Sequence, residues 1–342
     1  MTSRISAIAC HLPDRVVSNR DLMAENPAWN MSVIEQRAGV HSRHIARDGE
    51  TAFDLAKQAC DKLFSAQGQN VSSIDAIIFC TQTPDYIMPP NAHLLHKHLR
   101  MPDAVSAFDI NLACSGYIYG LAIAHSFIHA GVARRVLLAT ADTYSRYIHP
   151  GDRSARVLFG DGAAVSVIER GGEDGLSVFD LASNGEGYDK FFIPAGGQRL
   201  PLSPDTKKES IERSGNVRTP EHIHMDGFAV WSFINSAVPK QILAHLQKRG
   251  TTLQDMDQFI FHQASRMTLE SLIKILKIPE AKVPMNLGTV GNTVSASIPM
   301  CLAQAIRDDR IRRGDRVLLS GFGVGLSYGT TSFRYESDID VY

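Results

Sequence analysis

The sequence predicts an α/β fold made of two similar halves. Strand-like apolar runs alternate with helical segments along all 342 residues, which is the βαβ rhythm of a doubly wound sheet. The segment IDAIIFCTQ at 74–82 resembles MDQFIFHQA at 256–264, and ARRVLLAT at 133–140 resembles GDRVLLSG at 314–321. The members of these pairs are 182 and 181 residues apart. Two matches at nearly one offset favour a duplicated unit over chance similarity between buried strands.

The expected elements follow in chain order. Short apolar runs predict strands at 76–80, 136–139, 165–168, 259–261, 317–319 and 332–335. The stretch of small and apolar residues at 115–131 predicts a helix between the first two strands. We expect one half of the duplication to cover 1–172 and the other to cover 173–342.

The composition, with 44% hydrophobic and 21% charged residues, is typical of a soluble globular protein. The formal net charge is −1 and no Lys/Arg cluster is present, which argues against binding to nucleic acid or to an anionic membrane. No apolar run reaches the roughly 20 residues that span a bilayer, and the N-terminus lacks a signal-peptide pattern. The five cysteines form no CxxC or Cys/His cluster. We therefore expect a reduced, cytoplasmic protein without a metal site.

Cys114 lies in NLACSGYIYGL, just before the predicted helix. A thiol at a helix N-terminus lies near free backbone N–H groups and the positive end of the helix dipole, which predicts a lowered pKa and a reactive thiolate. Ala113, Ser115 and Gly116 are small and leave room for a substrate. The alternative is a packed core cysteine. We apply that interpretation to the other four cysteines, which are Cys10, Cys60, Cys80 and Cys301.

Two polar residues follow predicted strands of the second half. His262 comes directly after the run FIF, and Asn292 lies in GTVGNTVSAS at 288–297, before a helix. In a duplicated α/β pair the loops at the carboxyl ends of the strands face one crevice, so we expect Cys114, His262 and Asn292 to meet. The histidine could donate a hydrogen bond or move a proton, and the asparagine could stabilise an oxyanion or enolate. The structural alternatives are sheet-edge capping by the histidine and turn or N-cap chemistry by the asparagine.

The glycine-rich turns at 159–164 and 321–329 precede predicted strands. Neither has the helix context or the GKS/T ending of a nucleotide-binding loop, although the second could offer a backbone N–H group to an oxyanion. The sequence has no paired carboxylates and no Cys/His protease signature. A cysteine nucleophile with a histidine and an asparagine therefore indicates acyl transfer from a thioester.

Five motifs, DINLACSGYIYGL, DRSARVLFGDGAA, FHQAS, GNTVSASIP and GFGVGLSYGTTSFRY, resemble those of β-ketoacyl-acyl carrier protein synthase III, in the same order. The segment QRAGVHSRHIA at 36–46 is similar to the early signature of that family. The resemblance spans nearly the whole chain. It implies the five-layer αβαβα fold of the thiolase superfamily, with two halves related by pseudo-twofold symmetry. It also implies a homodimer that uses an acyl-CoA and an acyl carrier protein, without a metal or redox cofactor.

The resemblance also assigns roles to residues. Cys114 would be the acylated nucleophile, in the first half. His262 and Asn292, in the second half, would stabilise the enolate formed when a malonyl thioester loses carbon dioxide, and that carbanion would attack the acyl thioester. The backbone N–H groups of Cys114 and Val324 would bind the oxyanion, and Phe322 matches the aromatic residue beside the nucleophile.

For coenzyme A, Arg153 matches the arginine on one side of the adenine, and Arg37 matches a phosphate-side arginine. Val33 stands where the bacterial fatty-acid enzymes of the family have a tryptophan on the adenine, and Trp29, four residues earlier, is the candidate substitute.

Two further departures concern the acyl carrier. Ser265 replaces an asparagine that contacts the pantetheine arm in the family. Met267 replaces an arginine that helps dock the carrier protein, and Arg266 lies beside it. Together with Val33, these departures suggest a specialised paralogue rather than a housekeeping enzyme.

Two segments lie outside these motifs. The polar, Pro/Gly-rich segment 183–225 is either a surface or dimer-edge excursion or a lid over an acyl pocket. The segment TPDYIMPPNAHLLH at 83–96 matches the pocket-lining and dimer-contact segment of the family. Its residues Tyr86, Ile87 and Met88 would set the acyl-chain length or belong to an interface.

Three functions follow. The first is a decarboxylative condensation of an acyl-CoA primer with a malonyl thioester, which gives a 3-oxoacyl product. The second is transfer of the acyl group from Cys114 to an oxygen or nitrogen acceptor without decarboxylation. The third is a non-catalytic scaffold, which the joint presence of cysteine, histidine and asparagine disfavours.

Overall fold

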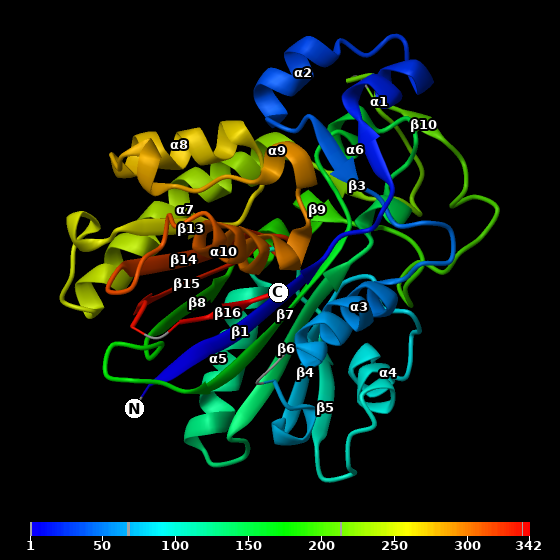
Figure 1. The fold of residues 1–342 in the computed structure, drawn as a ribbon. Coiled ribbons are helices and arrows are strands. Elements are labelled where there is room, and N and C mark those ends of the chain that lie inside the picture. Colours follow the sequence, from blue (N-terminus) through cyan, green and yellow to red (C-terminus); the bar gives the residue numbers. More distant parts are fainter. Residues whose placement is uncertain (1, 67–68, 213, 337) are drawn as a thin grey trace.

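The computed structural model describes residues 2–66, 69–212, 214–336 and 338–342. Its core contains two β-sheets (Figure 1). Their strands are β1 (Ser3–His11), β4 (Ala76–Cys80), β5 (Ser106–Ile110), β6 (Arg135–Asp142), β7 (Gly162–Arg170), β8 (Phe179–Ser183), β13 (Gln258–Phe261), β14 (Arg316–Gly323), β15 (Ser327–Arg334) and β16 (Asp340–Val341). The larger sheet has the order β16-β1-β7-β6-β4-β5, and the smaller has the order β13-β14-β15-β8.

The two sheets repeat one arrangement. β4 runs parallel to β6, as β13 does to β14, and the next two neighbours are antiparallel in both sheets. The matched sequence segments lie on β4 and β13 and on β6 and β14, so the predicted pair of similar halves is confirmed. β16 pairs with β1, which places the last strand in the sheet of the first half. The boundary at 172/173 stays a prediction.

Five layers follow from the packing of apolar faces (Figure 1). α5 (Gly116–His129) and α10 (Ser297–Arg307) share one buried cluster with strands of both sheets, so they form the central layer. α3 (Ala52–Ser65) and α4 (Asn91–His98) cover the outer face of the larger sheet. α7 (Gly227–Lys248) and α8 (Arg266–Leu276) cover the outer face of the smaller sheet. The predicted αβαβα layering is confirmed, and because α5 is covered on both sides it is apolar around most of its circumference.

The remaining elements are short. They are α1 (Asn19–Glu25), α2 (Met31–Ala38), α6 (Arg153–Arg156), α9 (Leu287–Val290), β2 (Val16–Ser18), β3 (Ser42–His44), β9 (Phe191–Phe192), β10 (Ser210–Ile211), β11 (Val217–Arg218), β12 (His224–Met225) and the 3₁₀ helices η1 (Val71–Ser73), η2 (Tyr144–Tyr147), η3 (Gly185–Lys190), η4 (Leu253–Asp255), η5 (Glu280–Lys282) and η6 (Val294–Ala296). α1, α2, α6 and β10 gather at one end of the molecule (Figure 1). Within the described ranges, no helix is long and apolar enough to cross a membrane.

A buried ion pair attaches the segment 183–225 to α6. Arg218 is 4% exposed, and its Nε donates to the Asp152 carboxylate at 2.7 Å. Asp152 also accepts from the backbone N–H of Ser154 at 2.9 Å and so caps α6. The pair therefore holds the segment beside Arg153, the first residue of α6.

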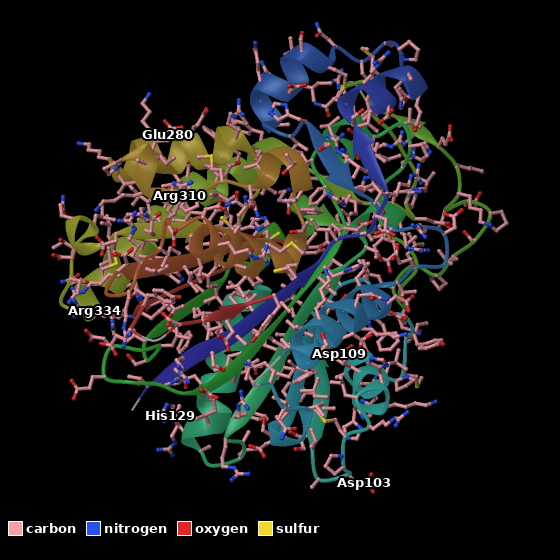
Figure 2. All side chains as sticks on the ribbon, in the orientation of Figure 1. Asp103, Asp109, His129, Glu280, Arg310 and Arg334 are labelled. Carbon is pink, nitrogen blue, oxygen red and sulfur yellow. The ribbon has the colours of Figure 1, made fainter. Side chains whose placement is uncertain are left out.

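Asp109 of β5, labelled in Figure 2, begins α4 in the same way. Its carboxylate accepts from the backbone N–H groups of Asn91 and Ala92 at 2.7 and 2.8 Å. A negative charge at a helix N-terminus is stabilising, so this contact fixes the start of α4 and the loop 84–90 before it.

Candidate active site

A cavity of about 560 Å³ lies where the polar loops of the two halves meet. Cys114 reaches it from the turn before α5, His262 from the residue after β13, and Asn292 from the turn between α9 and η6. All three are nearly buried, with 3%, 1% and 4% of their surface exposed. The structure thus brings together the three residues that the repeat predicted to meet.

The thiol of Cys114 is less acidic than we expected. Burial raises the pKa of Cys114 to about 12, and a hydrogen bond from the backbone N–H of Val324 opposes that rise only in part. The expectation of a lowered pKa from the helix dipole is therefore wrong. The helix begins at Gly116, two residues after the thiol, and loss of hydration outweighs the dipole.

Two backbone N–H groups face the sulfur of Cys114. They belong to Cys114 itself and to Val324, which follows β14. Gly323 permits this approach, because a Cβ at that position would lie 2.7 Å from the Sγ atom of Cys114. A carbonyl carbon bonded to the sulfur places its oxygen near both donors, which is the geometry that stabilises a tetrahedral oxyanion.

His262 is a neutral imidazole. Burial lowers the pKa of His262 to about 3. The Nδ1 atom lies 2.6 Å from the Ser297 hydroxyl, which itself accepts from the backbone N–H of Gln263 at 3.5 Å. When Ser297 donates to Nδ1, the ring proton lies on Nε2, on the side of Asn292. The Phe322 ring packs edge-on against the imidazole, with centroids 5.7 Å apart, and lines the same cavity.

Asn292 presents its amide N–H groups next to this imidazole. The Nδ2 atom lies 3.4 Å from Nε2 of His262. The orientation is fixed because Oδ1 accepts from the backbone N–H of Val294 at 2.9 Å. The backbone of Asn292 is attached to the first half, since its N–H donates to the Leu158 carbonyl at 2.8 Å and its carbonyl accepts from Gly160 at 3.0 Å. One oxygen atom can accept from both side chains, so the pair can bind a thioester carbonyl and stabilise its enolate.

A second cavity, of about 330 Å³, adjoins the first. Val324 and Gly325 belong to its wall, and Phe191 lines both cavities. Five of its wall residues come from the segment 183–225, which fits the lid interpretation of that segment better than the surface-loop interpretation. They are Tyr188, Phe191, Phe192, Ile193 and Ile223.

Three of the five residues expected to bind the acyl carrier or coenzyme A line the first cavity, and these are Arg37, Arg153 and Ser265. Val33 and Met267, which we interpreted as departures from the family pattern, line it too.

Two expected binding residues lie elsewhere. Trp29 is not in the wall of the first cavity and packs against Val17, Leu22 and Met31. Arg266 packs its Cβ against Gly39, on the α2 side. The exposed side chains of Tyr86, Ile87 and Met88 line neither cavity of this chain.

Three features of the site escaped the sequence analysis. Trp231 of α7 lines the first cavity, and its position on a mostly apolar helix gave no signal. Ser297 was visible in GNTVSASIP, but its contact with His262 depends on where α10 begins.

The third feature is a buried pair, Ser295 and Asp142. The Ser295 hydroxyl donates to the Asp142 carboxylate at 2.5 Å. The repeat aligns Ser295 with Cys114, and Asp142 with Gly323. No motif in either segment indicated that Ser295 and Asp142 would form a pair.

Among the residues that the structure places, no group of three or more His, Cys, Asp or Glu side chains is arranged to hold a metal ion. The site instead combines a buried thiol, two backbone donors and two neutral side-chain donors. Together with the five-layer fold, this defines an acyl-transferring enzyme of the thiolase fold.

Comparisons with known proteins identify the family. The domain family described as 3-oxoacyl-[acyl-carrier-protein] synthase III matches residues 108–187, and the corresponding C-terminal family matches 246–335. The chain is 34% identical to the β-ketoacyl-[acyl-carrier-protein] synthase III of Clostridioides difficile (strain 630), with 97% of this chain and 98% of that protein covered.

Solved structures agree with this result. A crystal structure of 3-oxoacyl-(acyl-carrier-protein) synthase III superposes with a TM-score of 0.95 at 40% identity, covering 98% of this chain and 100% of that chain. The priming β-ketosynthase of the R1128 polyketide pathway superposes with a TM-score of 0.85 at 27% identity, covering 98% and 97%. The chain belongs to the β-ketoacyl-acyl carrier protein synthase III family, a family of condensing acyltransferases.

Proposed function

We propose that this enzyme condenses an acyl primer, carried on Cys114, with a malonyl thioester. The observation that carries the proposal is the pair of donors on His262 and Asn292, 3.4 Å apart in the cavity that also contains the nucleophile. Simple acyl transfer needs the thiol and an oxyanion site. A second set of donors is required when a second carbonyl must be stabilised as an enolate.

The first half-reaction loads the primer. The sulfur of Cys114 attacks the carbonyl carbon of an acyl-CoA, and the N–H groups of Cys114 and Val324 stabilise the oxyanion. The bond to the coenzyme A sulfur then breaks, and the proton lost by Cys114 ends on the departing thiol. Arg37 and Arg153 lie on the wall where they can neutralise phosphate groups of the donor.

The second half-reaction forms the carbon–carbon bond. The malonyl thioester carbonyl accepts from Nε2 of His262 and Nδ2 of Asn292, and the bond to the carboxylate breaks to release carbon dioxide. The resulting enolate carbon attacks the acyl carbonyl on Cys114, and the carbon–sulfur bond breaks to give a 3-oxoacyl product and the Cys114 thiolate. That thiolate takes a proton from solvent, because burial raises the pKa of Cys114 to about 12. The atoms and charges of both half-reactions balance without an electron acceptor or a metal ion.

The proposal also includes the partners of the enzyme and its location. We assign the primer to coenzyme A, the malonyl group to acyl carrier protein, and the reaction to the cytoplasm. The loop 84–90 presents Tyr86, Ile87 and Met88 with 57%, 97% and 81% of their surface exposed, which supports burial of this loop in a homodimer. Light scattering of the native protein and of Ile87→Asp tests the dimer: we expect the native protein to be dimeric and the variant to be more monomeric.

The reaction itself is tested in two steps with three variants. Intact-protein mass spectrometry measures acylation, and release of labelled carbon dioxide from malonyl-acyl carrier protein measures condensation. We expect Cys114→Ala to lose the acyl adduct, and His262→Ala and Asn292→Ala to keep it while losing carbon dioxide release. Cys301→Ala, at an equally buried cysteine outside both cavities, is the matched control and keeps both steps.

Full condensation by His262→Ala would contradict the enolate role. Acyl transfer to an added amine or alcohol, without loss of carbon dioxide from malonyl thioester, would favour the alternative acyltransferase.

A further inference from the structure

The second cavity lies where the acyl group on Cys114 would extend. Cys114 belongs to one buried cluster with Tyr144, Phe191 and Ile223, and these three residues line the second cavity. The backbone N–H of Val324 faces the sulfur, and the same residue continues into the cavity wall. An acyl carbonyl held by that N–H group therefore directs its chain toward this space.

The wall of this cavity is more polar than a hydrocarbon chain needs. Five of its side chains carry hydrogen-bonding atoms, and none of its described residues carries a charge. The five are Gln82, Asn111, Tyr144, Tyr147 and Tyr188. An alkyl chain placed against such a wall would separate polar groups from water without replacing their hydrogen bonds, which is unfavourable.

A fixed pair of side chains lies in this wall. The hydroxyl of Tyr144, which is 3% exposed, donates to Oε1 of Gln82 at 2.5 Å. The backbone N–H of Gln82 donates to Asp142 at 2.8 Å, so the end of β4 is tied to the end of β6. The backbone N–H of Thr143 donates to Thr83 at 2.9 Å and ties the same two loops a second time. The pair is thus positioned before any ligand binds.

The Tyr144–Gln82 pair leaves hydrogen-bonding capacity unused. With Oε1 occupied, the Nε2 donors of Gln82 have no acceptor among the described residues, and the Tyr144 oxygen can still accept one hydrogen bond. One donor beside one acceptor is the complement of a hydroxyl group, which both accepts and donates. An anionic substituent fits less well, because the wall provides no cation and the Asp142 carboxyl lies next to Gln82.

We propose that Gln82 and Tyr144 select acyl primers that carry an uncharged hydroxyl substituent, in preference to plain alkyl or aryl and to carboxylated primers. This inference rests on the proposed function, since it takes Cys114 as the residue that carries the primer. A site built to bind a hydroxyl discriminates strongly against the analogue that lacks it, because its own polar groups are then left unpaired.

The test compares matched thioesters of N-acetylcysteamine, which avoid any dependence on the acyl carrier. The probes are 3-hydroxybutyryl, butyryl and succinyl, together with 3-hydroxybenzoyl and benzoyl. Mass spectrometry follows the acylation rate of Cys114 in the native protein, in Tyr144→Phe, and in Gln82→Met, which keeps the side-chain length. Tyr119→Phe is the control, because its hydroxyl donates to the Ala182 carbonyl at 3.0 Å and lines neither cavity.

We expect the hydroxylated member of at least one pair to react about tenfold faster than its plain analogue, and succinyl to react more slowly than either butyryl form. We expect this preference to fall to about twofold or less in Tyr144→Phe and Gln82→Met and to persist in Tyr119→Phe. Equal rates within both pairs in the native protein, or a preference that survives both variants, would overturn the inference and leave the proposed function intact. No adduct from any probe on Cys114 would overturn both.

Discussion

The Nδ2 atom of Asn292 lies 3.4 Å from Nε2 of His262, and its orientation is set by the hydrogen bond from the Val294 backbone to Oδ1. The asparagine and the histidine thus present donors to one point in the cavity. Because Asn292 is also held by the backbone of Leu158 and Gly160, the first half of the chain positions a donor of the second half.

The variant Asn292→Asp tests this arrangement directly. The carboxylate keeps the shape of the amide but replaces its N–H donors with acceptors, which repel a developing enolate. We expect condensation to fall by about 10²-fold or more while acylation stays within about threefold, as for loss of one donor in an oxyanion site. Single-turnover assays with pre-acylated enzyme separate the two steps, and an unchanged condensation rate would exclude the donor role.

Because the thiol of Cys114 is buried, we expect the rate of its alkylation to depend steeply on pH. Burial raises the pKa of Cys114 to about 12, so the thiolate is a small fraction of the population near neutral pH. We expect the rate of reaction with iodoacetamide to increase about tenfold per pH unit between pH 7 and 10, as long as the fold is intact. Mass spectrometry of the Cys114 peptide measures this rate, and a plateau near pH 8 would show that the thiol is more acidic than its burial implies.

We expect the buried His262 to make the folded protein less stable in acid. Its pKa is lowered to about 3 by burial, whereas an unfolded histidine titrates near 6.5, so between these values the unfolded chain binds the additional proton. The contribution of His262 to the unfolding free energy therefore decreases as the pH falls below about 6.5, and it is constant above that value.

Comparison with His262→Gln isolates this effect from the titration of other groups. Relative to the variant, we expect the native protein to lose up to about 1.4 kcal/mol for each pH unit between pH 6 and 4. Urea unfolding of both proteins at several pH values provides the measurement. A difference that does not depend on pH would mean that the folded state accepts a proton on His262.

We expect a side chain at position 323 to block access to the thiol of Cys114. In Gly323→Ala the new Cβ would lie 2.7 Å from Sγ and 2.8 Å from Cβ of Cys114, which is closer than carbon and sulfur atoms tolerate. We expect acylation to fall by about tenfold or more, with the cysteine still present. Gly197→Ala is the matched control, because nothing lies within 4 Å of its added Cβ, and native-like acylation of Gly323→Ala would contradict the close approach.

The repeat accounts for much of what the sequence could predict. It placed the strands β4, β6, β13 and β14, and through them the meeting of Cys114, His262 and Asn292. These predictions succeeded because buried strands have a clear apolar pattern and because the strand ends of a duplicated sheet face one crevice.

What the sequence could not predict depends on packing between distant segments. The pKa of Cys114 is set by how completely the halves bury it, and this competes with a helix dipole that the local sequence does suggest. Trp231 of α7 lines the first cavity, whereas Trp29 packs against a separate apolar cluster, and this difference depends on how distant segments pack. The Tyr144–Gln82 pair joins two loops that are far apart in the chain, and neither loop contains a motif that predicts contact with the other.

The pair formed by Ser295 and Asp142 makes the two halves of the chain differ at equivalent positions. In the first half, the helix start provides a thiol and the facing strand end is a glycine, which leaves space for an acyl group. At the equivalent place in the second half, a carboxylate fills that space and binds the serine hydroxyl at 2.5 Å. The duplicated frame therefore contains two equivalent positions, and of these two only the one in the first half combines a thiol with open space beside it, which confines the proposed acylation to that half.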